Sequence, residues 1–92
     1  MKKILVIDDN EAVCTALMTL FQLQGYQVFI AQHPAQAKSI LQQQSIDLIL
    51  QDMNFAQGEM SGAQGKELFY QLRSDYPAIP VVLLTAWTHL DM

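Results

Sequence analysis

Four residues with reactive side-chain oxygens stand at the ends of short apolar runs in this sequence: Asp8, Asp9, Asp52 and Thr85. Parallel strands of one sheet all end at the same edge, and ligands bind in the crevice beyond those ends. If the apolar runs are such strands, three carboxylates and one hydroxyl converge at that edge. The sequence therefore predicts a reactive site at the carboxyl ends of the strands.

The chemistry of this site follows from its oxygen atoms. Three neighbouring carboxylates repel one another unless a proton or a cation lies between them. Mg²⁺ suits such a set, because it prefers one or two carboxylates, with waters and phosphate oxygens completing its shell. A carboxylate beside the metal can attack a phosphoryl group and form an acyl phosphate, while Thr85 hydrogen-bonds a phosphoryl oxygen. The residue types therefore predict Mg²⁺-dependent phosphoryl chemistry.

Strands and helices that would position these residues alternate along the chain. Runs of β-favouring apolar residues predict buried strands at residues 4–7, 26–31, 46–51 and 81–84. Helical spacing predicts helices at 11–24 and from Pro34 to the glutamine-rich run 42–45. A third helix is predicted to begin at the capping pair Ser61 and Gln64 and to end before Pro77. Such alternation is typical of an α/β fold with a doubly wound parallel sheet.

The first helix has the clearest boundaries. Asn10 is a good N-cap, and Gly25 is a typical C-terminal stop. Apolar residues recur within the helix at helical spacing, which predicts that they form its buried stripe. These residues are Val13, Ala16, Leu17, Leu20 and Phe21.

Composition excludes several classes of protein. The 92 residues suffice for one small core, and five Lys and Arg with a net charge of −4 leave no basic patch for direct binding of nucleic acid. Cys14 is the single cysteine, so no internal disulfide forms, and a small buried apolar role in a reducing cytoplasm is expected. The apolar run after Lys3 is too short for a signal peptide or a membrane span. We therefore expect a soluble cytoplasmic protein without a membrane partner.

The same residues resemble a known family, the receiver domains of two-component response regulators. Residues 4–11 look like the acidic pair of that family, residues 48–54 like its phosphoacceptor strand, and residues 79–86 like the strand that carries its switch hydroxyl. Gly62 and Gly65 resemble the loop glycines of these domains. The resemblance covers essentially the whole chain and implies a flavodoxin-like receiver fold with strand order 2-1-3-4. The loop after Asp52 is similar to that of receivers attached to AAA+ transcription activators that work with an alternative sigma factor.

This resemblance implies a role for each site residue. Asp52 would accept a phosphoryl group from the phosphohistidine of a sensor histidine kinase. Asp8, Asp9 and Asp52 would hold Mg²⁺ together with the backbone carbonyl of Asn54. The switch and phosphoryl contacts would come from Thr85 and Ala86. The phosphorylated domain would control a linked C-terminal output domain that regulates transcription.

The sequence departs from this family at its C-terminal end. Receivers continue into a further helix, a fifth strand with a lysine, and a last helix, whereas no lysine follows Lys66 here. We therefore expect one receiver domain over residues 1–92, incomplete at its C-terminus and without the fifth strand. Residues 81–84 would then form an open apolar edge of the sheet, which predicts self-association through the fourth strand.

Three functions compete for this pattern. The leading one is a signalling switch that phosphorylates itself and is not an enzyme with turnover of an external substrate. The alternative is a phosphorylation-independent pseudo-receiver that acts as an interaction or dimerisation module. A phosphatase or phosphotransferase with an aspartyl nucleophile is a third, but those enzymes have an Asp-x-Asp pattern, and Asn10 stands at its second acidic position.

Overall fold

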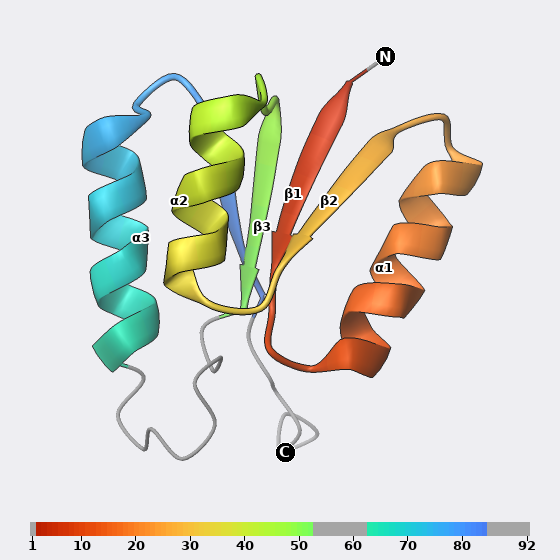
Figure 1. Ribbon diagram of the computed structural model, residues 1–92, viewed down its shortest axis with the longest axis horizontal. Coiled ribbons are helices and arrows are strands. Elements are labelled where there is room, and N and C mark those ends of the chain that lie inside the picture. The colour runs from red at the N-terminus through yellow and green to blue at the C-terminus, as the bar shows by residue number, and fades with distance from the viewer. Residues whose placement is uncertain (1, 53–62, 85–92) are drawn as a thin grey trace, which may run out of the picture.

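The computed structural model of the chain describes residues 2–52 and 63–84. Within these residues, strands and helices alternate along the chain (Figure 1). The elements are β1 (Lys3–Ile7), α1 (Glu11–Leu23), β2 (Gln27–Ala31), α2 (Pro34–Gln43), β3 (Leu48–Asp52), α3 (Ala63–Asp75) and β4 (Val81–Leu84). The predicted alternation of strand and helix is therefore confirmed.

The strands form one parallel sheet in the order β2-β1-β3-β4. One side of the sheet is covered by α1, and the other side by α2 and α3 (Figure 1). Helices on both sides are what right-handed crossovers between parallel strands produce. The doubly wound α/β fold and the strand order expected from the sequence are confirmed.

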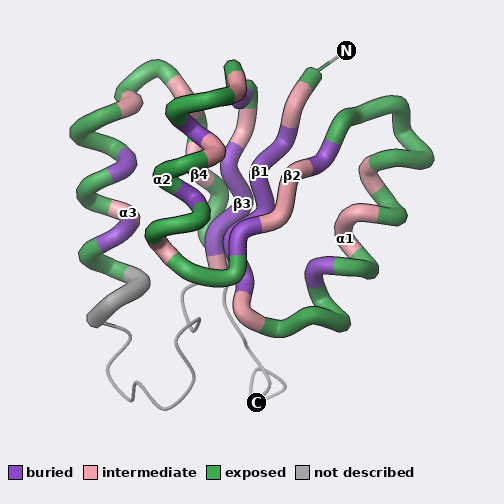
Figure 2. The backbone as a smooth tube through the Cα atoms, viewed as in Figure 1, coloured by how far each residue is buried: buried purple, intermediate pink, exposed green. Residues whose placement is uncertain are grey.

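Among the described residues, the core consists of two apolar clusters, one on each side of the sheet. Residues of β1 alternate between them: Leu5 and Ile7 face α2 and α3, whereas Ile4 and Val6 face α1. All four side chains are buried, so the centre of the sheet is covered on both sides (Figure 2). This double burial explains why residues 4–7 of the strand are a continuous apolar run.

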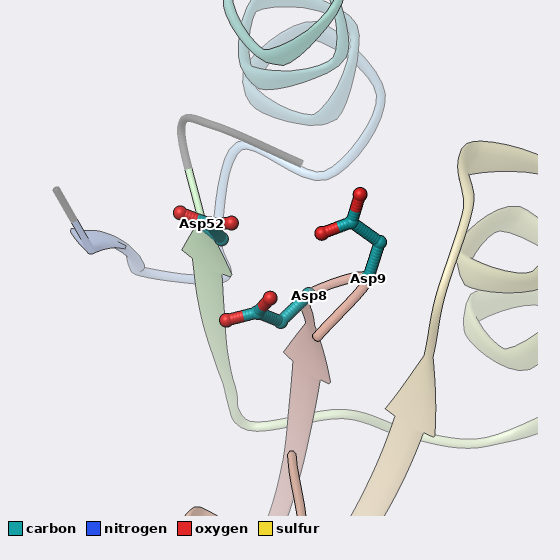
Figure 3. A group of neighbouring side chains, drawn as sticks. All are labelled: Asp8, Asp9 and Asp52. Carbon is teal, nitrogen blue, oxygen red and sulfur yellow. The ribbon is translucent and has the colours of Figure 1, made fainter. Parts of the chain in front are cut away.

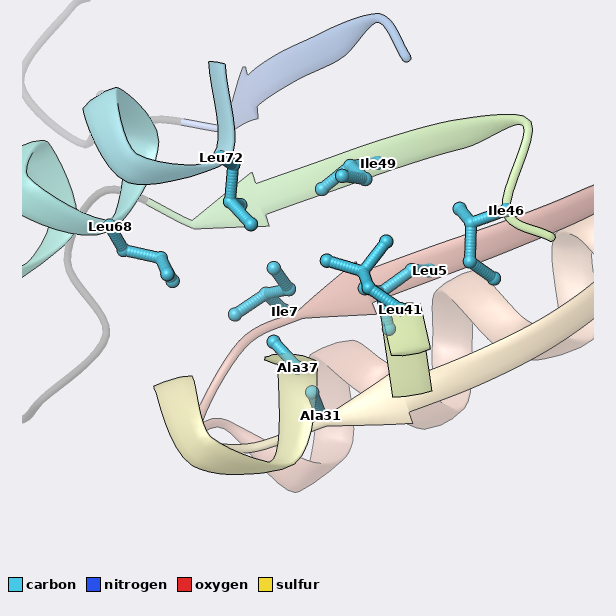
Figure 4. Close-up of a cluster of buried hydrophobic side chains, with 9 residues drawn as sticks. All are labelled: Leu5, Ile7, Ala31, Ala37, Leu41, Ile46, Ile49, Leu68 and Leu72. Atoms are coloured by element: carbon cyan, nitrogen blue, oxygen red, sulfur yellow. The ribbon is translucent and has the colours of Figure 1, made fainter. Parts of the chain in front are cut away.

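The larger cluster joins every element on the α2 and α3 side of the sheet. Its buried members are Leu5, Ile7, Ala31, Ala37, Leu41, Ile46, Ile49, Leu68 and Leu72 (Figure 4). Residues from β1, β3, α2 and α3 meet here, so this cluster fixes the relative positions of the strands whose ends carry the aspartates. Burial of each large aliphatic side chain contributes about 1.5–3 kcal/mol.

The predicted boundaries of α1 are confirmed. The Asn10 side chain accepts a hydrogen bond from the Val13 backbone N–H at 3.1 Å, as an N-cap does. Gly25 has a φ of 91°, a conformation that side-chain-bearing residues rarely adopt, and it lets the chain leave the helix.

The predicted buried stripe of α1 is only partly correct. Leu17 and Phe21 pack against the core around the buried Cys14, as expected for a small apolar thiol. Val13 and Leu20, however, are 37% and 51% exposed, and Ala16 is exposed too. Apolar residues cover more of the helix circumference than the sheet can bury, and within the described residues α1 is the helix on that side.

Two predicted strand starts shift toward the C-terminus. The third strand was expected from Ile46, but β3 begins at Leu48 and extends through Asp52. Ile46 is buried in the core before the strand begins, while the Asp47 backbone N–H donates to the Lys3 carbonyl at 2.8 Å. An apolar residue therefore contributes to the core without belonging to the strand, which sequence periodicity does not distinguish.

Tyr26 explains the other shift, because it lies just outside β2. Its backbone N–H donates to the Phe21 carbonyl at 3.0 Å, and its ring meets the Phe21 ring edge-on at 6.1 Å. The residue therefore closes the end of α1 instead of joining the sheet.

Candidate functional site

The acidic residues meet at the carboxyl ends of β1 and β3. Asp8 and Asp9 follow the last residue of β1, and Asp52 is the last residue of β3 (Figure 3). One carboxylate oxygen from each of these aspartates lies within 4.8 Å of the others. The two strands are adjacent and parallel, with Ile7 opposite Gln51. The convergence expected from the sequence is therefore present in the structure.

Backbone contacts fix the position of Asp8. Its N–H donates to the Ala31 carbonyl of β2 at 3.0 Å, and its Oδ1 accepts from the Asn10 N–H at 2.9 Å. Asp8 is only 4% exposed, whereas Asp9 and Asp52 are half-buried. The cluster thus combines one buried carboxylate with two that solvent can reach.

The electrostatics of Asp8 follow from this burial. Burial raises the pKa of Asp8 above its usual value, and the neighbouring Asp52 and Asp9 carboxylates raise it further. The hydrogen bond from the Asn10 N–H acts in the opposite direction and lowers the pKa of Asp8. A charged Asp8 is therefore disfavoured as long as the cluster contains only acids, and a bound cation would reverse this preference.

Cys14 makes a contact with Asp8 that sequence reasoning did not find. Its Sγ donates a hydrogen bond to the Asp8 backbone carbonyl at 3.1 Å. Burial, together with the nearby aspartates, raises the pKa of the Cys14 thiol, so the thiol stays protonated and remains a donor. The contact ties the first turn of α1 to the loop that carries Asp8. The prediction of a small buried residue was right, but no sequence signal marks this bond.

The donor set fits a hard divalent cation. All three side chains supply carboxylate oxygens, the ligands that Mg²⁺ and Ca²⁺ prefer, and two of them are accessible enough to exchange water. A cation placed among them would remove the repulsion that disfavours the charged form of Asp8. The cluster can therefore hold a metal ion and leave an aspartate oxygen available for chemistry.

Three residues named from the sequence lie outside the described part of the chain: Asn54, Thr85 and Ala86. The capping residue Ser61 and the glycine Gly62 lie outside it too. The roles assigned to these residues stay predictions. Across the described ranges 2–52 and 63–84, no helix is long and apolar enough to cross a membrane.

Comparisons with known proteins identify the family of the chain. The family model of the response regulator receiver domain matches residues 4–92. The transcriptional regulatory protein ZraR of Klebsiella oxytoca is 35% identical over 88 residues, which are 96% of this chain and 19% of that protein. Sporulation initiation phosphotransferase F of Bacillus subtilis is 33% identical over 91 residues, 99% of this chain and 69% of that protein.

A solved structure whose sequence identity to this chain is similar to that of these relatives has the same fold. The response regulator TrrA of Thermotoga maritima, crystallised with Mg²⁺ and beryllium fluoride, superposes with a TM-score of 0.79 at 30% identity, covering 97% of this chain and 73% of that one. The chain thus spans about a fifth of ZraR and roughly seven tenths of the shorter relatives. The family model covers nearly every residue, and the chain belongs to the response regulator receiver domain family.

Proposed function

We propose that Asp52 accepts a phosphoryl group from the phosphohistidine of a sensor histidine kinase, with Mg²⁺ held at the acidic cluster. One observation carries this proposal: oxygens of Asp8, Asp9 and Asp52 lie within 4.8 Å of one another at the ends of adjacent strands. Receiver domains are signalling modules of two-component systems, and this cluster is the described part of the chain best suited to such chemistry.

The transfer is a displacement at phosphorus. An Asp52 carboxylate oxygen forms a bond to phosphorus while the phosphorus–nitrogen bond of the donor breaks, and the imidazole leaves with a proton from solvent. Asp52 suits the role of nucleophile because it is the last residue of its strand and is only half-buried, so that a large phosphoryl donor can reach it. The product is an acyl phosphate on this chain, and no external substrate is turned over.

Asp8 and Asp9 are the proposed metal ligands, with Asp52 and the backbone carbonyl of Asn54 completing the protein's share. Bound Mg²⁺ would supply positive charge beside the oxygens of the transferring phosphoryl group. TrrA, which is similar to this chain, was crystallised with Mg²⁺ and beryllium fluoride, and this supports the same preference here. The deep burial of Asp8 suits a fixed ligand rather than a nucleophile.

The proposed output follows from the added charge. A phosphoryl group brings between about 1.5 and 2 negative charges and three strong acceptors, which bias a two-state element. Thr85 and Ala86 are proposed to sense this change and to pass it to a linked C-terminal output domain. Several relatives are transcriptional regulatory proteins of which the chain matches about a fifth, which supports a role in transcription. The cytoplasm is the proposed location.

The phosphoacceptor function is favoured over the phosphorylation-independent interaction module. A pseudo-receiver has no need to keep three mutually repelling carboxylates together, one of them deeply buried. Each of these acids has a part in phosphoryl transfer, whereas none has a part in a purely structural module.

Calorimetric titration with beryllofluoride, a mimic of the aspartyl phosphate, tests the proposal in the presence of Mg²⁺. The wild-type chain should bind, and binding should be lost in Asp52→Asn. Asp75→Asn is the matched control, because Asp75 is an exposed acid at the end of α3. A folded wild-type chain that does not bind beryllofluoride would contradict the proposed function.

We also propose that the chain self-associates through β4. Within the described residues this strand is hydrogen-bonded to β3 alone, which makes it an edge strand of the sheet among these residues. Its residues Val82 and Leu83 are 46% and 39% exposed. Apolar edges of this kind favour pairing with another chain. That residues 1–92 form a single domain likewise stays a prediction.

A further inference from the structure

A buried carboxamide stands directly before the proposed phosphoacceptor. Gln51 has 0% exposure and is one of the largest fully buried side chains of the described residues. The preceding residues of β3, from Leu48 to Leu50, are apolar. Buried amides are hydrogen-bonded as a rule, and burying an amide stabilises the fold less than burying an aliphatic side chain of equal size. Gln51 therefore breaks the apolar pattern of its strand at one particular place.

That place is the last row of the sheet before the acidic cluster. Gln51 lies between Ile7 of β1 and Leu83 of β4, its partners across the sheet. Ile7 is the last residue of β1, whereas Gln51 and Leu83 directly precede the last residues of β3 and β4. Ile7 and Gln51 precede Asp8 and Asp52. The pairing of β1 with β3 ends at Ile7 and Gln51. This row is thus the last point at which the sheet fixes the two acid-bearing strand ends to each other.

The side chain of Gln51 lies on the face of the sheet that is covered by α2 and α3. Alternation along a strand places it on the same face as Ile49, which lies in the large apolar cluster (Figure 4). In such surroundings a polar group tolerates few positions, because burying it away from water is costly. Apolar packing alone fixes a strand end less sharply, because aliphatic contacts are non-directional.

We infer that Gln51 is a positioning residue for the acidic cluster: its buried carboxamide fixes the end of β3, so that the Asp52 carboxylate is held at a set distance from Asp8 and Asp9. The inference rests on the proposed function of the cluster. It explains why a polar residue stands at a core position next to mutually repelling acids. Apparent violations of core patterning are expected at functional sites.

Gln51→Met tests the inference, because methionine has a similar length and volume without the amide. Beryllofluoride affinity in Mg²⁺ should fall by about 10- to 100-fold, the usual effect of removing a residue that orients a metal site. Ile49→Met is the matched control on the same strand and face, one residue pair further from the cluster. It should leave the affinity within about twofold while changing the urea midpoint of unfolding.

A second variant separates positioning from folding. Gln51→Asn keeps the amide but withdraws it by one methylene, so affinity should fall while the chain still folds. Equal affinity of the wild-type chain and both folded Gln51 variants would overturn the inference and leave the proposed function intact. Failure of both variants to fold would also overturn it, because Gln51 would then be a structural residue. Absence of binding by the folded wild-type chain would overturn the proposed function itself.

Discussion

Asp8 is the residue whose environment differs most from that of an ordinary aspartate. It is almost fully buried, its backbone is held by β2 and by Cys14, and two other carboxylates lie beside it. Most folded proteins avoid this arrangement, because burial and like charge both disfavour the carboxylate form. In the metal-free chain Asp8 therefore lowers the stability of the fold at neutral pH.

Asp8→Asn should stabilise the metal-free chain at pH 7 by on the order of 1–3 kcal/mol, the repulsion expected between unit charges at this separation near a protein surface. The pKa of Asp8 is raised in the folded state, so the native chain binds more protons than the unfolded chain, and stability is lost as pH rises through that pKa. The gain from Asp8→Asn should therefore shrink toward pH 4. Urea unfolding in a chelator at both pH values measures it.

The hydrogen bond from the Asn10 N–H lets the Asp8→Asn test separate the charge of Asp8 from its backbone contact. Asparagine at position 8 retains an Oδ1 that can accept from the Asn10 N–H, so only the charge is removed. Asp75→Asn, at an exposed position, should produce no comparable gain. A variant that is less stable than the wild-type chain at pH 7 would show that the Asp8 charge supports the fold.

Mg²⁺ should make the wild-type chain more stable than Asp8→Asn, the reverse of the order expected without metal. A ligand that binds only the native state stabilises it by about 2.7 kcal/mol at a concentration 100 times its Kd. The wild-type chain should therefore gain stability on addition of Mg²⁺, and Asp8→Asn should gain much less. Thermal unfolding over a range of Mg²⁺ concentrations, with Na⁺ at equal ionic strength as the control, tests this. Equal shifts for both proteins would remove Asp8 from the proposed set of metal ligands.

At the scale of elements, α1 connects the acidic cluster to the sheet. Its N-cap Asn10 also donates the backbone N–H that Asp8 accepts, and its first turn carries the Cys14 thiol that bonds the Asp8 carbonyl. The start of the helix and the position of the buried Asp8 are therefore set by the same contacts. The other end of the helix depends on Gly25, which has a positive φ.

Gly25→Ala should destabilise the chain by about 1–2 kcal/mol, because the left-handed conformation costs this much for a residue with a Cβ. Nothing lies within 4 Å of a Cβ built at this position, so the loss is a backbone effect without a steric clash. Urea unfolding measures it. Gln22→Ala, an exposed change in the last turn of α1, is the control and should have little effect. An unchanged midpoint for Gly25→Ala would mean that the turn relaxes to another conformation.

At the scale of the whole molecule, the sheet is covered unequally. Two helices cover one side, while within the described residues α1 is the helix on the other, toward β2. Val82 of β4 is opposite Leu50, a member of the cluster on the α1 side, and it is 46% exposed. The exposed apolar surface at the β4 edge is therefore formed by a strand of the sheet, not by a helix.

Size-exclusion chromatography with light scattering should show concentration-dependent self-association of the wild-type chain. Val82→Lys should shift the chain toward monomer, because a charge on an edge strand opposes pairing. Leu20→Lys is the matched control, since Leu20 is similarly exposed but lies on α1, away from the edge. A wild-type chain that stays monomeric at all concentrations would contradict self-association, and an equal effect of both variants would place the contact elsewhere.

The sequence by itself determined the order of the elements and the position of the acids. A parallel strand covered on both sides must be a continuous apolar run, and residues that follow such runs must meet at one edge of the sheet. These constraints act within short segments, so Ile4–Ile7 and the aspartates after it could be interpreted without any knowledge of distant residues. The resemblance to receiver domains supplied the strand order, which local patterns do not contain.

Only the tertiary structure decided how each residue is used. It showed that Asp8 is the buried acid of the cluster and that Cys14 bonds its carbonyl. It also showed that Val13 and Leu20 lie outside the core despite their helical spacing, and that Gln51 lies inside it despite its polarity. The physical reason is the same in each case: burial and hydrogen bonding depend on which distant segments lie beside a residue, and local periodicity carries no information about them.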